Sequence, residues 1–269
     1  MAHYYTRNRE TAYTVPYANG KPGKATKVTD ARELGLVPSS TGVESMQPKP
    51  GVVWWQRSKS ALAGAEHANL LPKMDEKDWL RMVHREADKA TERAAEVGSI
   101  MHDIIEAVVN NDPMPDVEFP MPDPDKFFDS FCEWWPKQGI TVLETELVVV
   151  HPLGYGGRID LVGIDEDERD VILDWKTRDT TGKKIEQLVY KDSNPLQLVS
   201  YLEGYKYYIG TKHGAYVNDP RLLNVIISRD EPGRIESYEW PREEHGRYWG
   251  WFKHLLGAWK YKNNYDPAF

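Results

Sequence analysis

Cysteine and long apolar runs are almost absent from this chain of 269 residues, which has a single cysteine, Cys132. One cysteine excludes an intramolecular disulfide, and it also excludes a four-cysteine zinc site or an iron–sulfur cluster held by this chain alone. No apolar run approaches the roughly 20 residues that a membrane-spanning helix needs. Residues 1–10 are polar and lack the apolar core of a secretory signal. We therefore expect a cytoplasmic protein without a membrane partner.

Net positive charge is also missing, because 42 Asp and Glu residues outnumber 34 Lys and Arg residues and leave a formal charge of -8. Residues 101–150 alone carry 11 acidic side chains and 2 basic ones, so the rest of the chain is close to neutral. The N-terminal segment is basic through Arg7, Arg9, Lys21, Lys24 and Lys27. Net acidity argues against a passive DNA-coating protein, whereas a metal-dependent nuclease needs acidic residues to hold its cation.

Enough apolar material is present for one large domain, since 40% of the residues are hydrophobic and 10 are tryptophan. Residues 1–38 show little periodicity, and we expect them to form a basic, flexible arm. Residues 39–262 are expected to form a single domain, and residues 263–269 a C-terminal tail.

Hydrophobic periodicity predicts helices first and strands after them. Short helices broken at Pro48 and Pro50 precede a long helix over 75–110 and, after a loop over 112–125, a helix over 127–137. The remaining predicted elements are strands over 142–150, 157–164 and 171–176, a helix over 195–209, strands over 224–228 and 235–240, and a helix over 241–262. This order predicts an α/β fold in which helices pack on one mixed sheet.

Two acidic residues near the ends of neighbouring apolar strands form the most informative pattern. Asp160 lies within the predicted strand 157–164. In the next predicted strand, Asp174 follows the apolar residues 171–173 and precedes Lys176 by two positions. A β-hairpin would hold these groups together, where two carboxylates can bind a hard divalent cation and the lysine can activate a water. Alternatively, the aspartates cap strands and Lys176 is a solvated edge charge. The abrupt change from apolar to charged residues favours the metal site.

Two helices each add a polar pair spaced four residues apart, so that each pair shares one helix face. His102 and Glu106 form the first pair. A helical histidine is more often a surface or core residue than a ligand, but beside the hairpin His102 becomes a candidate ligand and Glu106 a group that positions water. Gln197 and Tyr201 form the second pair, which makes a polar contact on an apolar helix, holds a DNA phosphate or orients Lys176.

Glu146, in the strand before Asp160, is a secondary candidate. It is either a further carboxylate of the site or an outward-facing strand residue. Most tryptophans are expected to fill the core, and one or two are expected to stack on unpaired bases, as single-stranded DNA is often held. The candidates for these two roles are Trp54, Trp55, Trp249, Trp251 and Trp259.

Taken in order, these motifs resemble the RecB-type branch of the PD-(D/E)XK nuclease superfamily. The chain looks most like the mitochondrial genome maintenance exonucleases and their phage-encoded relatives. The likeness includes residues 174–177 (DWKT), the helix from residue 194 and the aromatic final helix, and residues 49–54 (KPGVVW) resemble the family's N-terminal helical element. It covers about 39–262, and the joint order of the motifs is more specific than any one of them.

The resemblance implies a restriction-endonuclease-like core, with a central mixed β-sheet flanked by α-helices and DNA threaded across the active site. It implies that Lys176 is the catalytic lysine and that Mg²⁺ or Mn²⁺ is bound by Asp160, Asp174, the backbone carbonyl of Trp175 and His102. It implies that Gln197 and Tyr201 support the lysine, and Glu106 and Arg158 are further supporting or DNA-binding candidates. Asp174 stands where many relatives have glutamate, and the cysteines of some relatives are absent, which predicts no iron–sulfur cluster.

The expected activity is that of a metal-dependent DNA exonuclease that acts from single-stranded ends in replication, recombination or repair. Its expected partners are DNA and proteins of replication or recombination, in a bacterial cytoplasm or in that of a phage-infected host. Three alternatives are an endonuclease on the same fold, a non-catalytic module that binds DNA ends, and an α/β domain whose acidic hairpin merely solvates a sheet edge. The intact set of Asp160, Asp174 and Lys176 argues against the non-catalytic module.

Overall fold

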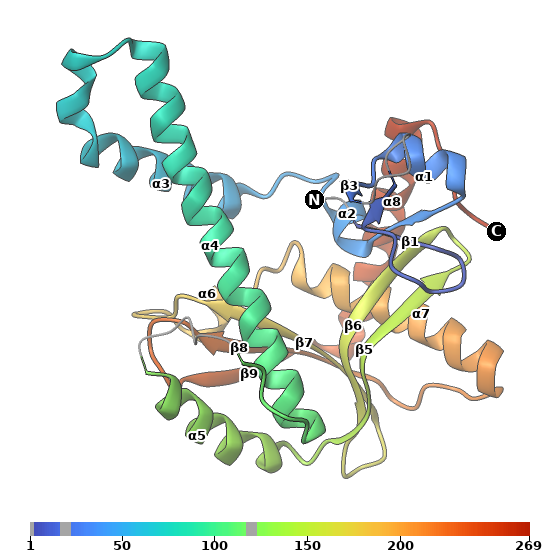
Figure 1. Cartoon of the computed structure of the whole chain (residues 1–269). Coiled ribbons are helices and arrows are strands. Elements are labelled where there is room, and N and C mark those ends of the chain that lie inside the picture. The colour runs from blue at the N-terminus through green and yellow to red at the C-terminus, as the bar shows by residue number, and fades with distance from the viewer. Residues whose placement is uncertain (1–2, 17–22, 117–122) are drawn as a thin grey trace.

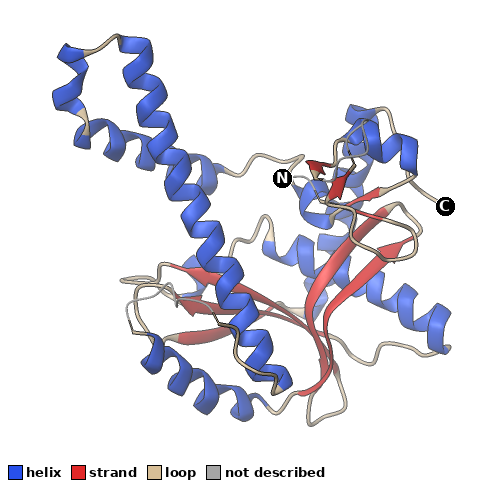
Figure 2. Ribbon diagram, in the orientation of Figure 1, coloured by secondary structure: helices blue, strands red, loops and turns tan. Residues whose placement is uncertain are grey.

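The computed structural model describes residues 3–16, 23–116 and 123–269, and its centre is a five-stranded sheet (Figures 1 and 2). β7 and β8 are parallel, and the other neighbouring strands are antiparallel, which confirms the predicted mixed sheet. In spatial order the strands are β5 (Thr141–His151), β6 (Tyr155–Ile164), β7 (Asp170–Arg178), β8 (Arg221–Ser228) and β9 (Ile235–Glu239).

Helices cover both faces of this sheet (Figure 2). One face carries α7 (Asn194–His213) and α8 (Arg242–Asn263), and the other carries α4 (Glu76–Asn110), α5 (Pro124–Trp134) and the 3₁₀ turn η2 (Trp135–Gln138). Successive strand residues point to opposite faces, so Ile172 of β7 joins the core under α7, whereas Leu173 joins the core under α4. The predicted α/β architecture is confirmed at this level.

Local signals set the ends of the main helices. The Asp75 side chain accepts a hydrogen bond from the Lys77 backbone N–H and caps α4 as the sequence predicts. Pro195 lies in the first turn of α7, and Gly214 ends that helix in the left-handed conformation. The loop expected over 112–125 is described only in part, because residues 117–122 lie outside the described ranges.

The flexible arm expected over residues 1–38 is wrong for the described part of that segment. β1 (Tyr4–Tyr5) pairs with β4 (Val37–Pro38), β2 (Thr14–Val15) pairs with β3 (Lys24–Ala25), and α1 (Val28–Leu34) packs beside them. Apolar side chains without periodicity anchor the segment in two clusters. Tyr4, Ala31 and Leu36 join the core under α7 and α8, and Tyr5 and Val37 pack together with Val150.

The tail expected over 263–269 is also packed onto the domain. Tyr265 donates its hydroxyl hydrogen to the Leu36 carbonyl, and the Phe269 N–H donates to the Pro152 carbonyl. Residues 3–16, 23–38 and 263–269 therefore belong to the same folded unit as the sheet.

A helical hairpin projects from this unit (Figure 1). After α2 (Ser40–Glu44), Pro50 begins α3 (Pro50–Glu66) instead of breaking a helix, because proline is tolerated in the first turn. A 3₁₀ turn, η1 (Ala68–Lys73), then joins α3 to α4, and a short helix, α6 (Ile185–Leu188), precedes α7. Across the described ranges, no helix has both the length and the apolarity needed to cross a membrane.

Candidate functional site

The site lies where β6 and β7 separate. The two strands pair from Ile164 and Asp170 as far as Leu161 and Leu173, and they part beyond that point. Asp160 then spans the opening, because its Oδ2 accepts a hydrogen bond from the Trp175 backbone N–H at 2.8 Å. The predicted hairpin is therefore formed, and it places Asp160 next to the segment that carries Asp174.

A buried chain of hydrogen bonds fixes the Asp174 carboxylate, which is only 1% exposed. Lys176 Nζ donates to Oδ1 at 2.6 Å, and Asn224 Nδ2 donates to Oδ2 at 2.7 Å. Trp240 Nε1 in turn donates to Asn224 Oδ1 at 2.7 Å. Asn224 is absent from the sequence predictions, although a single amide inside the apolar strand β8 is a signal that could have found it.

His102 on α4 reaches the same point from the opposite face of the sheet. Its Nε2 lies 3.1 Å from the Trp175 carbonyl oxygen, and its Nδ1 lies 3.7 Å from Asp160 Oδ2. One turn further along α4, Glu106 Oε1 accepts a hydrogen bond from the Thr145 hydroxyl on β5 at 3.1 Å. The structure thus brings His102, Asp160 and the Trp175 carbonyl together and holds Glu106 beside them.

The polar pair on α7 forms a hydrogen bond within itself. Gln197 Nε2 donates to Tyr201 Oη at 2.7 Å, and both side chains are buried. Gly157 allows Tyr201 to come this close, because a Cβ atom at Gly157 would lie 2.4 Å from the Tyr201 ring. The predicted pair therefore packs directly against β6, the strand that carries Asp160.

Glu146 faces the site, as the first of its two predicted roles requires. The register of β5 and β6 sets it opposite Asp160, and it forms an ion pair with Arg158 at 2.6 Å. Burial is the main cause that raises the pKa of Glu146 to about 7, and Arg158 partly opposes this shift.

One cavity of about 460 Å³ is lined by every side chain that the sequence singled out for the site. Its lining also contains Asp103, so that five acidic side chains face two basic ones, Arg158 and Lys176. Burial, followed by repulsion from Asp174, raises the pKa of Asp160 to about 6. The nine predicted side chains are His102, Glu106, Glu146, Arg158, Asp160, Asp174, Lys176, Gln197 and Tyr201.

A complete metal site made of side chains alone is not preformed. Within the described residues, no three His, Cys, Asp or Glu groups converge closely enough to hold an ion. Both oxygens of Asp174 accept hydrogen bonds, from Lys176 and Asn224. The third group beside Asp160 and His102 is therefore a backbone oxygen, the Trp175 carbonyl. The arrangement offers two carboxylates, one carbonyl and one imidazole around the opening of the sheet.

Comparison with known proteins does not place the chain in a family. Neither a protein-family model nor a curated protein sequence matches it. Among the solved structures that match is the crystal structure of SSO0001, which is 18% identical over 42% of this chain, with a TM-score of 0.26. The matched region spans 50% of that protein's length. Similarity at this level carries no conclusion about fold or activity.

Proposed function

We propose that this protein is a metal-dependent deoxyribonuclease that hydrolyses phosphodiester bonds, acting as an exonuclease on single-stranded DNA ends. The observation that carries the proposal is the acidic cavity in which Asp160, Asp174 and Lys176 meet His102 and the Gln197–Tyr201 pair. The order of one long helix, three antiparallel strands, a helix and a parallel strand supports a restriction-endonuclease-like core.

The residues at the opening of the sheet suit a hard divalent cation. Carboxylate and carbonyl oxygens from Asp160, Asp174 and Trp175 match the preference of Mg²⁺, and the His102 nitrogen extends this preference to Mn²⁺. The raised pKa of Asp160 reflects burial beside another carboxylate, a repulsion that a cation would relieve. When bound, such a cation would offset negative charge on the phosphate and make a water easier to deprotonate.

Lys176 holds its ammonium group at the wall of the cavity. The side chain is 19% exposed, and its ion pair with Asp174 orients the ammonium group so that it can donate to a phosphate oxygen or to the attacking water. Tyr201 and Gln197 form the buried wall behind it, and Arg158, which is 48% exposed, can contact the DNA backbone at the mouth.

Replacing the lysine tests the proposal directly. Lys176→Ala should abolish metal-dependent DNA cleavage and leave the circular dichroism spectrum at 25 °C like that of the parent. Lys206→Ala is the matched control, because Lys206 also pairs with an acidic residue, Glu203, but lies outside the cavity. Cleavage by Lys176→Ala at the parent rate would falsify the proposed site.

A second assay separates the exonuclease from its alternatives. Linear DNA labelled separately at each end should be degraded with Mg²⁺ or Mn²⁺ and should stay intact with a chelator, whereas circular single-stranded DNA should survive. Cutting of the circle would instead establish the endonuclease. Binding of DNA ends without cleavage under any divalent metal would point to the end-binding module.

A further inference from the structure

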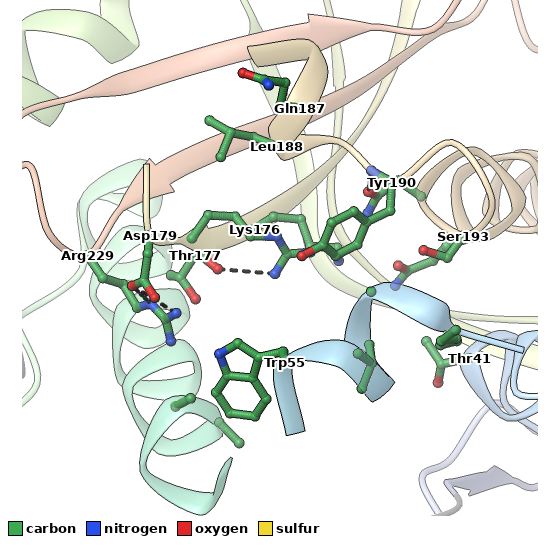
Figure 3. A pocket seen from close by; sticks show the side chains of 18 of the residues that line it. Thr41, Trp55, Lys176, Thr177, Asp179, Gln187, Leu188, Tyr190, Ser193 and Arg229 are labelled. Carbon is green, nitrogen blue, oxygen red and sulfur yellow. Dashed lines mark hydrogen bonds and ion pairs between the residues drawn. The ribbon is translucent and has the colours of Figure 1, made fainter. Parts of the chain in front are cut away.

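A second cavity, of about 430 Å³, lies beyond Lys176 (Figure 3). We call it the basic cavity, because five cationic side chains and two acidic ones line it. It shares Lys176 and Gln197 with the acidic cavity, where the balance of charge is reversed. Lys176 therefore lies between an acidic cavity that suits a cation and a basic cavity that suits an anion. The charged residues of the basic cavity are Lys49, Lys176, Arg178, Lys183 and Arg229, with Glu44 and Asp179.

Among the described residues, Arg178 forms no ion pair in this cavity. Its guanidinium stacks on the Tyr190 ring, with Cζ 4.7 Å from the ring centre, and its Nη1 donates to the Thr177 carbonyl. Its Nε is buried and has no hydrogen-bond partner among the described residues, and the nearby Asp179 pairs with Arg229 instead. Arg178 is half-buried, and a guanidinium that is partly removed from water without an ionic partner is costly. Phosphate oxygens, like those of a carboxylate, match its planar set of donors.

Glu44, on another wall, is compatible with an anionic ligand. The side chain is 2% exposed, and its Oε1 has no hydrogen-bond partner within the described residues. Burial raises the pKa of Glu44 to about 8, against the attraction of Lys49. At neutral pH its carboxyl group is therefore mainly protonated, so it offers an O–H donor and does not repel a phosphate.

Aromatic rings complete the lining. Figure 3 shows Trp55, from α3, and Tyr190, from the segment before α7, on different walls of the basic cavity. Aromatic faces next to basic side chains hold unpaired bases and the sugar–phosphate backbone of single strands. The volume falls within the ~300–1,000 Å³ of small-ligand sites, so the cavity has the size and chemistry for one nucleotide.

We infer that the basic cavity is the subsite for the unpaired nucleotide next to the phosphate that is cleaved. Arg178 binds a phosphate oxygen of the strand, and Trp55 stacks on the base. The inference rests on the proposed function and adds a physical basis for single-strand preference, because a base that is paired in a duplex does not present its face to Trp55.

The test measures binding without cleavage, by fluorescence anisotropy of a fluorescein-labelled oligothymidylate in the presence of a chelator. Trp55→Leu should weaken binding about 5- to 150-fold, the range expected for one lost base–aromatic stack. Trp54→Leu is the matched control and should bind like the parent, because Trp54 is 71% exposed and lies outside the cavity. A blunt duplex should compete poorly with the oligothymidylate.

Arg178→Gln should also weaken binding, and it should reduce the slope of log affinity against log salt by about 0.7, the value of one phosphate contact on a single strand. Arg247→Gln, on α8 and outside the cavity, should leave the slope unchanged. If Trp55→Leu and Arg178→Gln both bound like the parent, or if the parent did not bind the oligonucleotide, the subsite would be overturned even in an active nuclease. If the parent bound the oligonucleotide through this subsite but cut no DNA, only the nuclease proposal would be wrong.

Discussion

Glu44 is a carboxyl group whose ionisation opposes folding. Its pKa in the folded protein is about 8, compared with its ordinary value of 4.5, because burial disfavours the charged form more than Lys49 stabilises it. Between these two values the folded state holds a proton that the unfolded state has released. Stability contributed by this group is therefore lost as the pH rises through this window.

The size of the effect follows from the two pKa values. Each unit of difference corresponds to about 1.36 kcal/mol, so the interval from 4.5 to about 8 sets an upper value of about 5 kcal/mol for the loss. Glu44→Gln keeps the shape of the side chain and cannot ionise. We expect this variant to match the parent in free energy of unfolding near pH 5 and to exceed it by several kcal/mol above about pH 8.

Urea unfolding at a series of pH values measures this difference. Glu243→Gln, at an exposed position of α8, is the control, and its free energy of unfolding relative to the parent should change little with pH. A difference between Glu44→Gln and the parent that stays flat from about pH 5 to about pH 8 would refute the reasoning. It would mean that Glu44 is ionised in the folded protein and that the adjoining cavity is more acidic than proposed.

Two further predictions test the site. Asn224→Ala removes the donor to Asp174 and leaves Trp240 Nε1 without its acceptor, so it should lower the free energy of unfolding by roughly 2–5 kcal/mol. Trp240→Phe should then cost less stability in the Asn224→Ala variant than in the parent. Equal costs in denaturant unfolding would contradict the proposed link between the two side chains. His102→Ala should raise the Mn²⁺ concentration for half-maximal cleavage at least about tenfold, and a metal titration that matches the parent would remove His102 from the site.

The order of secondary structure could be predicted from the sequence because its signals are local. Apolar and β-branched runs mark the strands, Asp75 marks the start of α4, and Pro195 marks the first turn of α7. The first strands, β1 to β4, each contain two residues, and such short pairs show no periodicity. They are stabilised by tertiary contacts of residues such as Tyr4 and Val37, which explains why residues 1–38 were expected to be flexible.

The members of the acidic cavity could be named from short motifs and their order, but their contacts could not. That Gln197 bonds Tyr201, and that Glu146 lies opposite Asp160, depends on strand register and on how α7 crosses the sheet. Glu44 and Arg178 carry no motif at all. Their role emerges only from one buried atom in each side chain, Glu44 Oε1 and Arg178 Nε, that has no hydrogen-bond partner within the described residues, and no local pattern encodes this property of the folded chain.

The parallel pairing of β7 with β8 has a topological consequence for the site. A parallel neighbour cannot be reached through a tight turn, so the chain must cross over the sheet through a long connection, usually a helix. Here that connection contains α7, which packs on the face of β7 toward which Asp174 and Lys176 point. The strand order thus requires a crossover segment over this face, and Gln197 and Tyr201 lie on the helix that provides it.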